Sequence, residues 1–152
     1  MQCYNVTLWG GLRVTGAQPT LSICTTCRDG LEARLETRGG VRLAAHVVEE
    51  HARRPEIPMK LRGIRCMSQC KRSCIVSLGA PGKFTYVFGD LDPADKTHVA
   101  ALFELVEKYT KSVDGFLDRR ERPDILQASI LGRFPPLESQ SHLVSDLQAK
   151  AS

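Results

Sequence analysis

The chain has 152 residues, of which 42% are hydrophobic and 25% are charged, and its formal net charge is +4. These values are typical of one globular domain with an ordinary buried core. The sequence contains no apolar run of about 18 residues that could span a membrane and no leader typical of secretion, so we expect a cytoplasmic protein with no membrane partner.

Residues 1–20 show little pattern, because glycine and proline interrupt the short apolar run from Val6 to Trp9. We predict that they form a loose N-terminal extension and that Cys3 is an incidental free cysteine. The patterned domain is predicted to cover residues 21–137. The polar residues 138–152 are predicted to form a disordered tail.

The first half of the domain predicts a strand, a helix and a second strand. Residues 21–23 form a short apolar strand that leads directly to Cys24. Residues 41–54 place apolar side chains on one helical face, and the prolines that follow end this helix. The second strand is predicted over residues 59–64, shortly before Cys66.

The next residues predict a β-hairpin. Residues 75–78 and 84–88 are its strands, the second with large aromatic side chains at every other position. Between them, residues 80–83 contain Pro followed by Gly, which is the signature of a type II turn.

Two helices are predicted after the hairpin. Asp92 is a favoured N-cap and Pro93 suits the first turn, and an apolar stripe from Val99 to Tyr109 follows at helical spacing. The last helix is predicted to run from Pro123 to Leu131, with Gly132 as its stop.

A strand-helix-strand unit followed by an antiparallel hairpin and a covering helix is a thioredoxin-like α/β plan. We therefore predict an α/β fold with a thioredoxin-like sheet, an antiparallel hairpin and flanking helices. In this plan, the loops after the first two strands lie at the same edge of the sheet. Cysteines in both loops are then expected to come together.

Five of the six cysteines fall in two clusters, Cys24-x-x-Cys27 and Cys66-x-x-x-Cys70-x-x-x-Cys74. The cysteine content lies well below the share of about 8–10% that is typical of disulfide scaffolds. Soft metal centres of iron or zinc take about four thiolates, which two such loops can supply, so the clusters predict one thiolate metal site. Spacing alone leaves iron–sulfur, zinc and a thiol-disulfide function of the first pair open.

Basic residues flank both clusters, above all Arg28, Arg65, Lys71 and Arg72. Such a charge run is often only a solvated face. The functional alternative is that these residues offset the negative charge of thiolate ligands or bind an acidic partner. Nucleic-acid binding is not predicted, because aromatic residues make up only 6% of the chain and are not interleaved with the basic ones.

The sequence shows no catalytic constellation. His46, His51, His98 and His142 lie away from the cysteine loops and are interpreted as ordinary surface or core residues. Neither a Ser-His-Asp pattern nor a phosphate-binding glycine loop stands out. The sequence therefore does not predict an enzyme.

The strings CTTCRDG, GIRCMSQCKRSC, APGKFTYVFGDLDP and RERPDIL resemble a bacterial family of uncharacterised proteins predicted to bind metal, which is related to the thioredoxin-like 2Fe-2S ferredoxins. The resemblance covers residues 21–137. In those ferredoxins, two cysteines after the first strand and a C-x-x-x-C after a later strand hold the cluster. The resemblance implies that Cys66 and Cys70 are the second pair of ligands and that Cys24 and Cys27 are the first. It also implies a redox partner protein, and it leaves a homodimer open because the related ferredoxins often pair.

Two features depart from the ferredoxin pattern. Those proteins usually have more residues between the first two cysteines than separate Cys24 from Cys27, and they usually carry a proline at the position of Cys74. Cys74 is therefore interpreted as an alternative ligand, a reserve for cluster exchange or a buried small residue. The sequence predicts a one-electron carrier with one 2Fe-2S cluster. The alternative is a protein that binds or delivers zinc or another metal, which the resemblance links to cobalamin synthesis.

Overall fold

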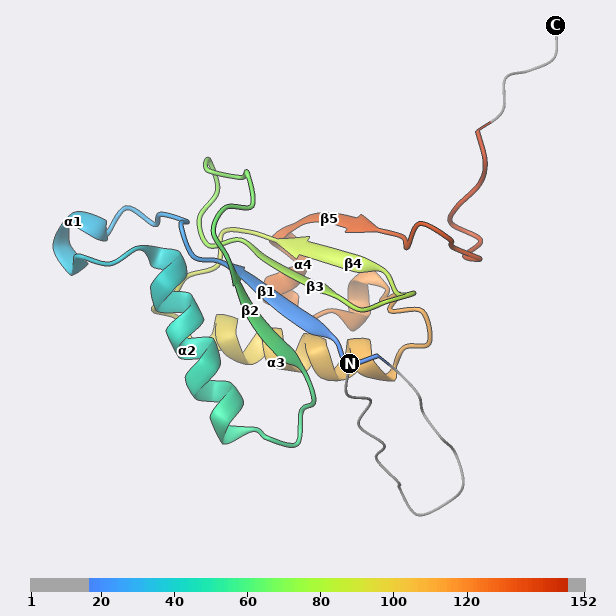
Figure 1. Ribbon diagram of the computed structural model, residues 1–152, viewed down its shortest axis with the longest axis horizontal. Helices are drawn as coiled ribbons and strands as arrows, with labels where there is room; N and C mark the ends of the chain where they lie inside the picture. Colours follow the sequence, from blue (N-terminus) through green and yellow to red (C-terminus); the bar gives the residue numbers. More distant parts are fainter. Residues whose placement is uncertain (1–16, 148–152) are drawn as a thin grey trace, which may run out of the picture.

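The computed structural model describes residues 17–147, which form a five-stranded sheet with helices packed against it (Figure 1). The strand order is β2-β1-β3-β4-β5, and only the pair β1 and β2 is parallel. The strands are β1 (Thr20–Cys24), β2 (Lys60–Ile64), β3 (Val76–Gly79), β4 (Thr85–Phe88) and β5 (Ile130–Phe134).

The parallel pair is joined by helix α2 (Gly39–Arg53), which follows the short helix α1 (Glu32–Leu35). Strands β3 and β4 then form an antiparallel hairpin, and helix α3 (Lys96–Lys111) follows it. This order is the predicted strand-helix-strand unit with a hairpin and a covering helix. The predicted thioredoxin-like α/β plan is therefore confirmed.

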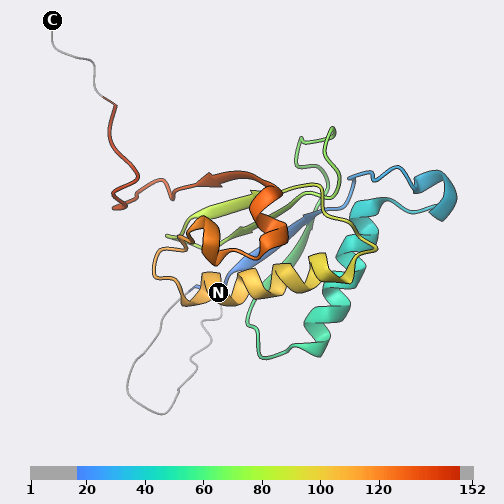
Figure 2. The ribbon, with the colours of Figure 1, turned by 180° about the vertical axis from the view of Figure 1, so that it is seen from behind.

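One face of the sheet carries the main core. Helices α2, α3 and α4 (Asp124–Ala128) lie against this face (Figure 2). The aromatic side chains at every other position of β4 share one face, as predicted, because Tyr86 and Phe88 both point into the core and are fully buried. The ring of Tyr109 from α3 meets Tyr86 edge to face, with the ring centroids 6.2 Å apart.

The hairpin turn has the predicted type II form. Lys83 N donates to the carbonyl of Ala80 at 3.1 Å, and Gly82 has a φ of +70°, a value that glycine adopts without steric strain. The same turn holds α3, because the Lys83 ammonium donates to the carbonyls of Tyr109 and Ser112 at the C-terminal end of that helix. A cation at this end also offsets the negative pole of the helix dipole.

The predicted start of α3 was wrong by one turn. The helix begins at Lys96, and its N-cap is Asp95, whose side chain accepts a hydrogen bond from Thr97 N at 2.8 Å. Asp92 caps a tight turn before the helix instead, with its carboxylate accepting from Ala94 N. Both aspartates suit a helix N-terminus, so composition alone could not choose between them.

The predicted last helix was also too long. Helix α4 ends at Ala128, and residues 130–134 form β5, which pairs with β4. Pairing satisfies the backbone groups of β4 on its outer edge, which a helix in this place would leave unpaired. Gly132, read as a helix stop, is a strand residue with the ring of Phe134 packed over it. A short 3-10 helix, Arg119–Glu121, precedes α4.

The predicted N-terminal extension falls mostly, and the predicted tail partly, outside the described residues. Residues 1–16, with Cys3, and residues 148–152 are not described, so their predicted looseness stays a prediction. Thr20 is already part of β1, which places the first strand one residue earlier than predicted. Residues 138–147 form neither helix nor strand. None of the helices in residues 17–147 is long and apolar enough to span a membrane.

The corrected start of α3 can be tested with a matched pair of substitutions. We expect Asp95→Ala to lower the urea midpoint of unfolding clearly, because it removes the N-cap of a long helix. Asp92→Ala removes only a turn contact and should lower the midpoint less. The unfolding curve is followed by circular dichroism. A larger loss for Asp92→Ala would contradict Asp95 as the cap.

Candidate metal centre

Four cysteines, from the end of β1 and from the loops after β1 and β2, line one recess of about 270 Å³ at an edge of the sheet. They are Cys24, Cys27, Cys66 and Cys70. The cause is the parallel pairing of β1 and β2, in which Cys24 lies opposite Ile64, so that both strands end together. The chain after each end therefore enters the same region, as the sequence predicted.

The first pair of thiols is built into the end of the sheet. Cys24 is the last residue of β1, and its backbone N donates to the carbonyl of Ile75 at 2.9 Å. Ile75 N in turn donates to the sulfur of Cys27 at 3.4 Å. Both cysteines are buried, with exposed fractions of 3% and 7%. This pair is held by backbone hydrogen bonds and is largely shielded from water.

Helix α2 starts in close contact with this pair. Gly40 N donates to the carbonyl of Cys27 at 3.1 Å. A Cβ on Gly40 would lie 1.9 Å from the carbonyl oxygen of Cys24, which no side chain could tolerate without a backbone shift. Glycine is therefore required here, and it lets the positive end of a 15-residue helix approach the thiols.

The second pair sits on the loop between β2 and β3, and both of its cysteines are exposed. Ser68 N donates to the sulfur of Cys66 at 3.3 Å, across a turn in which Ser68 has a φ of +58°. The loop is joined to the first one because the hydroxyl of Thr26 donates to the carbonyl of Arg65. The recess thus has a buried pair of thiols on one side and an exposed pair on the other.

The two buried thiols differ in acidity. Burial raises the pKa of Cys24, but its hydrogen bonds with the side chains of Thr26 and Cys27 and with backbone N–H groups outweigh burial, so the pKa falls below its usual value. Burial raises the pKa of Cys27 to about 11, and the neighbouring Cys24 thiolate adds to this. Cys24 is therefore the more readily ionised thiol of the pair.

Cys74 faces a different part of the molecule. It is fully buried and does not line the recess. Its sulfur lies beside Gly39 and near the ion pair between Arg42 and Asp29, whose nitrogen and oxygen are 2.6 Å apart. Burial raises the pKa of Cys74 to about 12, and the negative charges of Cys27 and Asp29 contribute. Of its three interpretations, this geometry favours the buried small residue.

The flanking cations divide into two groups. Arg28 lines the recess, and Arg65 and Lys71 are exposed next to Cys66 and Cys70. Arg72 instead forms an ion pair with Asp90, with Nη2 and Oδ2 2.5 Å apart.

The structure also adds a cation that sequence reasoning missed. Arg38, the N-cap of α2, lines the recess and donates to the carbonyl of Thr26 at 3.1 Å. In the sequence it lies eleven residues beyond Cys27. The only sequence feature that points to Arg38 is its position as a basic residue at the start of the helix that follows the first loop.

The histidines stay outside the recess. His46 Nδ1 lies 2.6 Å from the carbonyl oxygen of Pro93, and His98 Nδ1 accepts from Asp92 N at 3.0 Å. Within residues 17–147, no three His, Cys, Asp or Glu side chains are grouped so that they could hold a single metal ion. The four thiols of the recess stand instead as two pairs.

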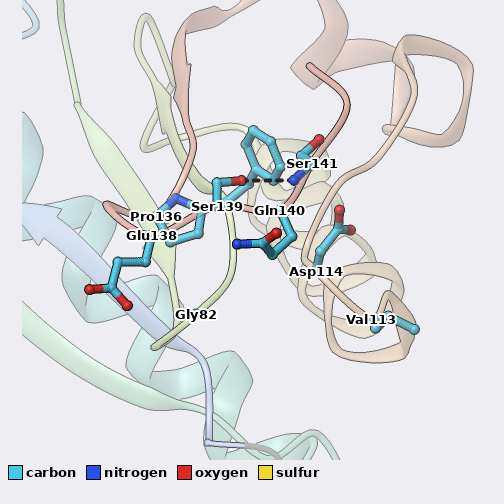
Figure 3. Close-up of a pocket in the computed structure, with 9 residues that line it drawn as sticks. Gly82, Val113, Asp114, Pro136, Glu138, Ser139, Gln140 and Ser141 are labelled. Carbon is cyan, nitrogen blue, oxygen red and sulfur yellow. Dashed lines mark hydrogen bonds between the residues drawn. The ribbon is translucent and has the colours of Figure 1, made fainter. Parts of the chain in front are cut away.

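A second recess, of about 330 Å³, lies at the hairpin end of the sheet (Figure 3). It is lined by Asp114, Pro136 and residues 138–141, and Ser141 N donates to the hydroxyl of Ser139 at 3.2 Å. The Asp114 carboxylate accepts from Phe116 N and serves its own loop. No cysteine or histidine lines this recess, whereas four cysteines line the other one.

The donor set of the cysteine recess fits a soft metal centre. Thiolates are the preferred ligands of iron–sulfur clusters and of structural zinc. Four of them line one recess, and backbone N–H groups donate to the sulfurs of Cys27 and Cys66 and lower the pKa of Cys24. Such donors orient ligands and tune a metal centre.

Gly40 gives a test of how the first pair is held. We expect Gly40→Ala to destabilise the protein by at least about 2 kcal/mol, because the new Cβ overpacks the backbone of Cys24, and to reduce the metal bound per chain. Gly82→Ala is the matched control, since it has open space and only a strained φ, with an expected cost of about 1 kcal/mol. The Gly82→Ala variant should leave the metal content unchanged. Urea unfolding and elemental analysis give the two readouts, and equal metal content in both variants would contradict the contact.

The burial of the thiols predicts an order of chemical labelling. In the reduced, metal-free protein, iodoacetamide should modify Cys66 and Cys70 first and Cys24 and Cys27 more slowly. Cys74 should react only in urea, because its thiol is fully buried and its pKa is raised. Peptide mass spectrometry measures the rates. Labelling of Cys74 at the rate of Cys66 would show that it is accessible.

Comparison with known proteins gives a family and two structural neighbours. The family model described as "Protein of unknown function (DUF1636)" matches residues 21–136. No curated protein matches the chain. Two solved structures of thioredoxin-like [2Fe-2S] ferredoxins from Aquifex aeolicus are similar to it, each with 16% sequence identity. One covers 76% of this chain and 98% of its own, with a TM-score of 0.47, and the other covers 81% and 99%, with a TM-score of 0.48.

Proposed function

The chain belongs to the DUF1636 family of proteins of unknown function, and we propose from its site that it binds one 2Fe-2S cluster and carries single electrons. The proposed ligands are Cys24, Cys27, Cys66 and Cys70. In this proposal the protein is a carrier that serves a redox partner and is not itself an enzyme.

The observation that carries the proposal is the common recess of the four thiols. A 2Fe-2S cluster takes four cysteine thiolates, two for each iron. The recess offers two pairs, one from the end of β1 and the loop after it and one from the loop after β2. It lies at the surface, so a partner protein can approach it.

The residues around the recess have separate tasks. The backbone N–H groups of Ile75 and Ser68 donate to the sulfurs of Cys27 and Cys66, which stabilises negative charge on these ligands. The buried pair excludes water from one side, and the exposed pair leaves the other side open. When bound, the cluster would supply the one-electron chemistry, and the protein contributes ligation, burial and charge.

Zinc is the alternative, because the same four thiolates could hold it. The two residues between Cys24 and Cys27 are also typical of zinc pairs. The purified protein separates the two proposals directly. We expect it to be brown, with visible charge-transfer bands and equal amounts of iron and inorganic sulfide. A colourless protein with stoichiometric zinc would refute the iron–sulfur proposal.

Substitution of single cysteines tests the ligand set. We expect Cys66→Ser and Cys70→Ser to bleach or strongly alter the visible spectrum, because each removes a thiolate. Cys74→Ala and Cys3→Ser are the matched controls and should keep both spectrum and iron content. Absorption spectroscopy and iron analysis measure the result. An unchanged spectrum in Cys70→Ser, or loss of iron in Cys74→Ala while the protein stays folded, would show that the assignment is wrong.

A further inference from the structure

The end of the molecule that holds the cysteine recess carries cations without acidic partners. Arg28 and Arg38 line the recess, and Arg65 and Lys71 extend from the exposed loop beside it. All four side chains are exposed, and none of them forms an ion pair within residues 17–147. We call these four residues the recess cations.

Asp29 and Glu32, the first two acidic residues after Cys27 in the chain, are already engaged. Asp29 forms an ion pair with Arg42 and accepts from Leu31 N. The carboxylate of Glu32 accepts from the backbone N–H groups of Asp29 and Gly30, so it serves its own loop. Their hydrogen bonds hold them in place, and the recess cations keep their charge free for an external anion.

Arg72 has a different role, although it lies directly after Lys71. Its ion pair with Asp90 ties the exposed cysteine loop to the residues after β4. A second bond reinforces this attachment, because Asp90 N donates to the carbonyl of Ser73 at 2.6 Å. The charge of Arg72 is therefore matched within the chain, and the residue anchors the loop.

We propose that the recess cations Arg28, Arg38, Arg65 and Lys71 form the docking surface for an acidic protein, and that Arg72 is not part of it. The proposal rests on the proposed electron-carrier function, because a partner docked here would lie over the exposed thiols of Cys66 and Cys70. Complementary charge at such a surface speeds encounter and sets orientation.

A protein suits this surface better than a nucleic acid does. Proteins that bind single strands stack bases on aromatic side chains, and none of the residues that line the recess is aromatic. Two of the charges, those of Arg28 and Arg38, line a compact recess of about 270 Å³. Carboxylates grouped on a protein surface can match such a group of cations.

The test uses an acidic peptide of about 20 Asp and Glu residues and a DNA duplex of similar charge as probes. Binding is measured by fluorescence anisotropy at low salt and at about 150 mM salt. We expect the peptide to bind the intact protein more tightly than the duplex does. Arg38→Gln and Lys71→Gln should each weaken peptide binding about two- to fivefold at low salt, and less at high salt.

Two matched controls remove one positive charge elsewhere. Arg72→Gln removes the paired cation, and Lys111→Gln removes an exposed one at the far end of α3. Both should leave peptide affinity nearly unchanged, because in Arg72→Gln the hydrogen bond from Asp90 N to the carbonyl of Ser73 still attaches the loop. The proposal is overturned if Arg72→Gln weakens binding as much as Arg38→Gln does, if the peptide does not bind at low salt, or if the duplex binds more tightly.

The visible spectrum of each variant is recorded in parallel. A colourless wild-type protein that binds the peptide as expected would refute the cluster and leave the docking surface standing.

Discussion

The parallel pairing of β1 and β2 is the constraint on which the rest of the site depends. It brings the ends of two strands, about forty residues apart in the chain, to one edge of the sheet. Because side chains alternate along a strand, a slip of one residue would turn Leu21 and Ile23 out of the core and Cys24 into it. The same apolar residues that fix the fold therefore also fix which way the first thiol faces. Helix α2 makes the connection, and its glycine start allows it to pack against the cysteine loop.

Much of this arrangement is readable from the sequence because it rests on local patterns. The apolar strand before Cys24, the amphipathic helix after it and the Pro-Gly hairpin turn each have a signal within a few residues. The start of α3 was missed because Asp92 and Asp95 carry the same local signal, and only the helix packing selects one. Strand β5 was missed because its pairing partner, β4, lies far away in sequence. A short segment with few apolar residues, such as Ile130–Phe134, does not by itself show whether it will be helix or strand.

The candidate site, like the fold, was predictable from the sequence only in part. The meeting of Cys24, Cys27, Cys66 and Cys70 follows from strand order, which the sequence predicts. Arg38 and Arg72 do not follow from it, because their roles depend on three-dimensional neighbours. Arg38 reaches the recess only because α2 begins there, and Arg72 lies beside a free cation in sequence but meets Asp90 in space. Spacing along a chain shows which thiols can share a site, whereas the state of each surrounding charge is set by tertiary contacts.

The loop that carries Cys66 and Cys70 is attached at both of its ends, and Met67 packs against the buried cysteine pair, whereas residues 68–71 at its tip are exposed. Thr26 bonds it before Cys66, and Asp90 bonds it after Cys70 through Ser73 and Arg72. A segment with strong attachments at its base and exposed backbone at its tip opens at a lower free energy than the sheet beneath it. The tip, with Cys70, can therefore fluctuate locally while β1, β2 and the buried pair stay folded. For the proposed metal centre, assembly and disassembly would then begin from the solvent side, without unfolding of the domain.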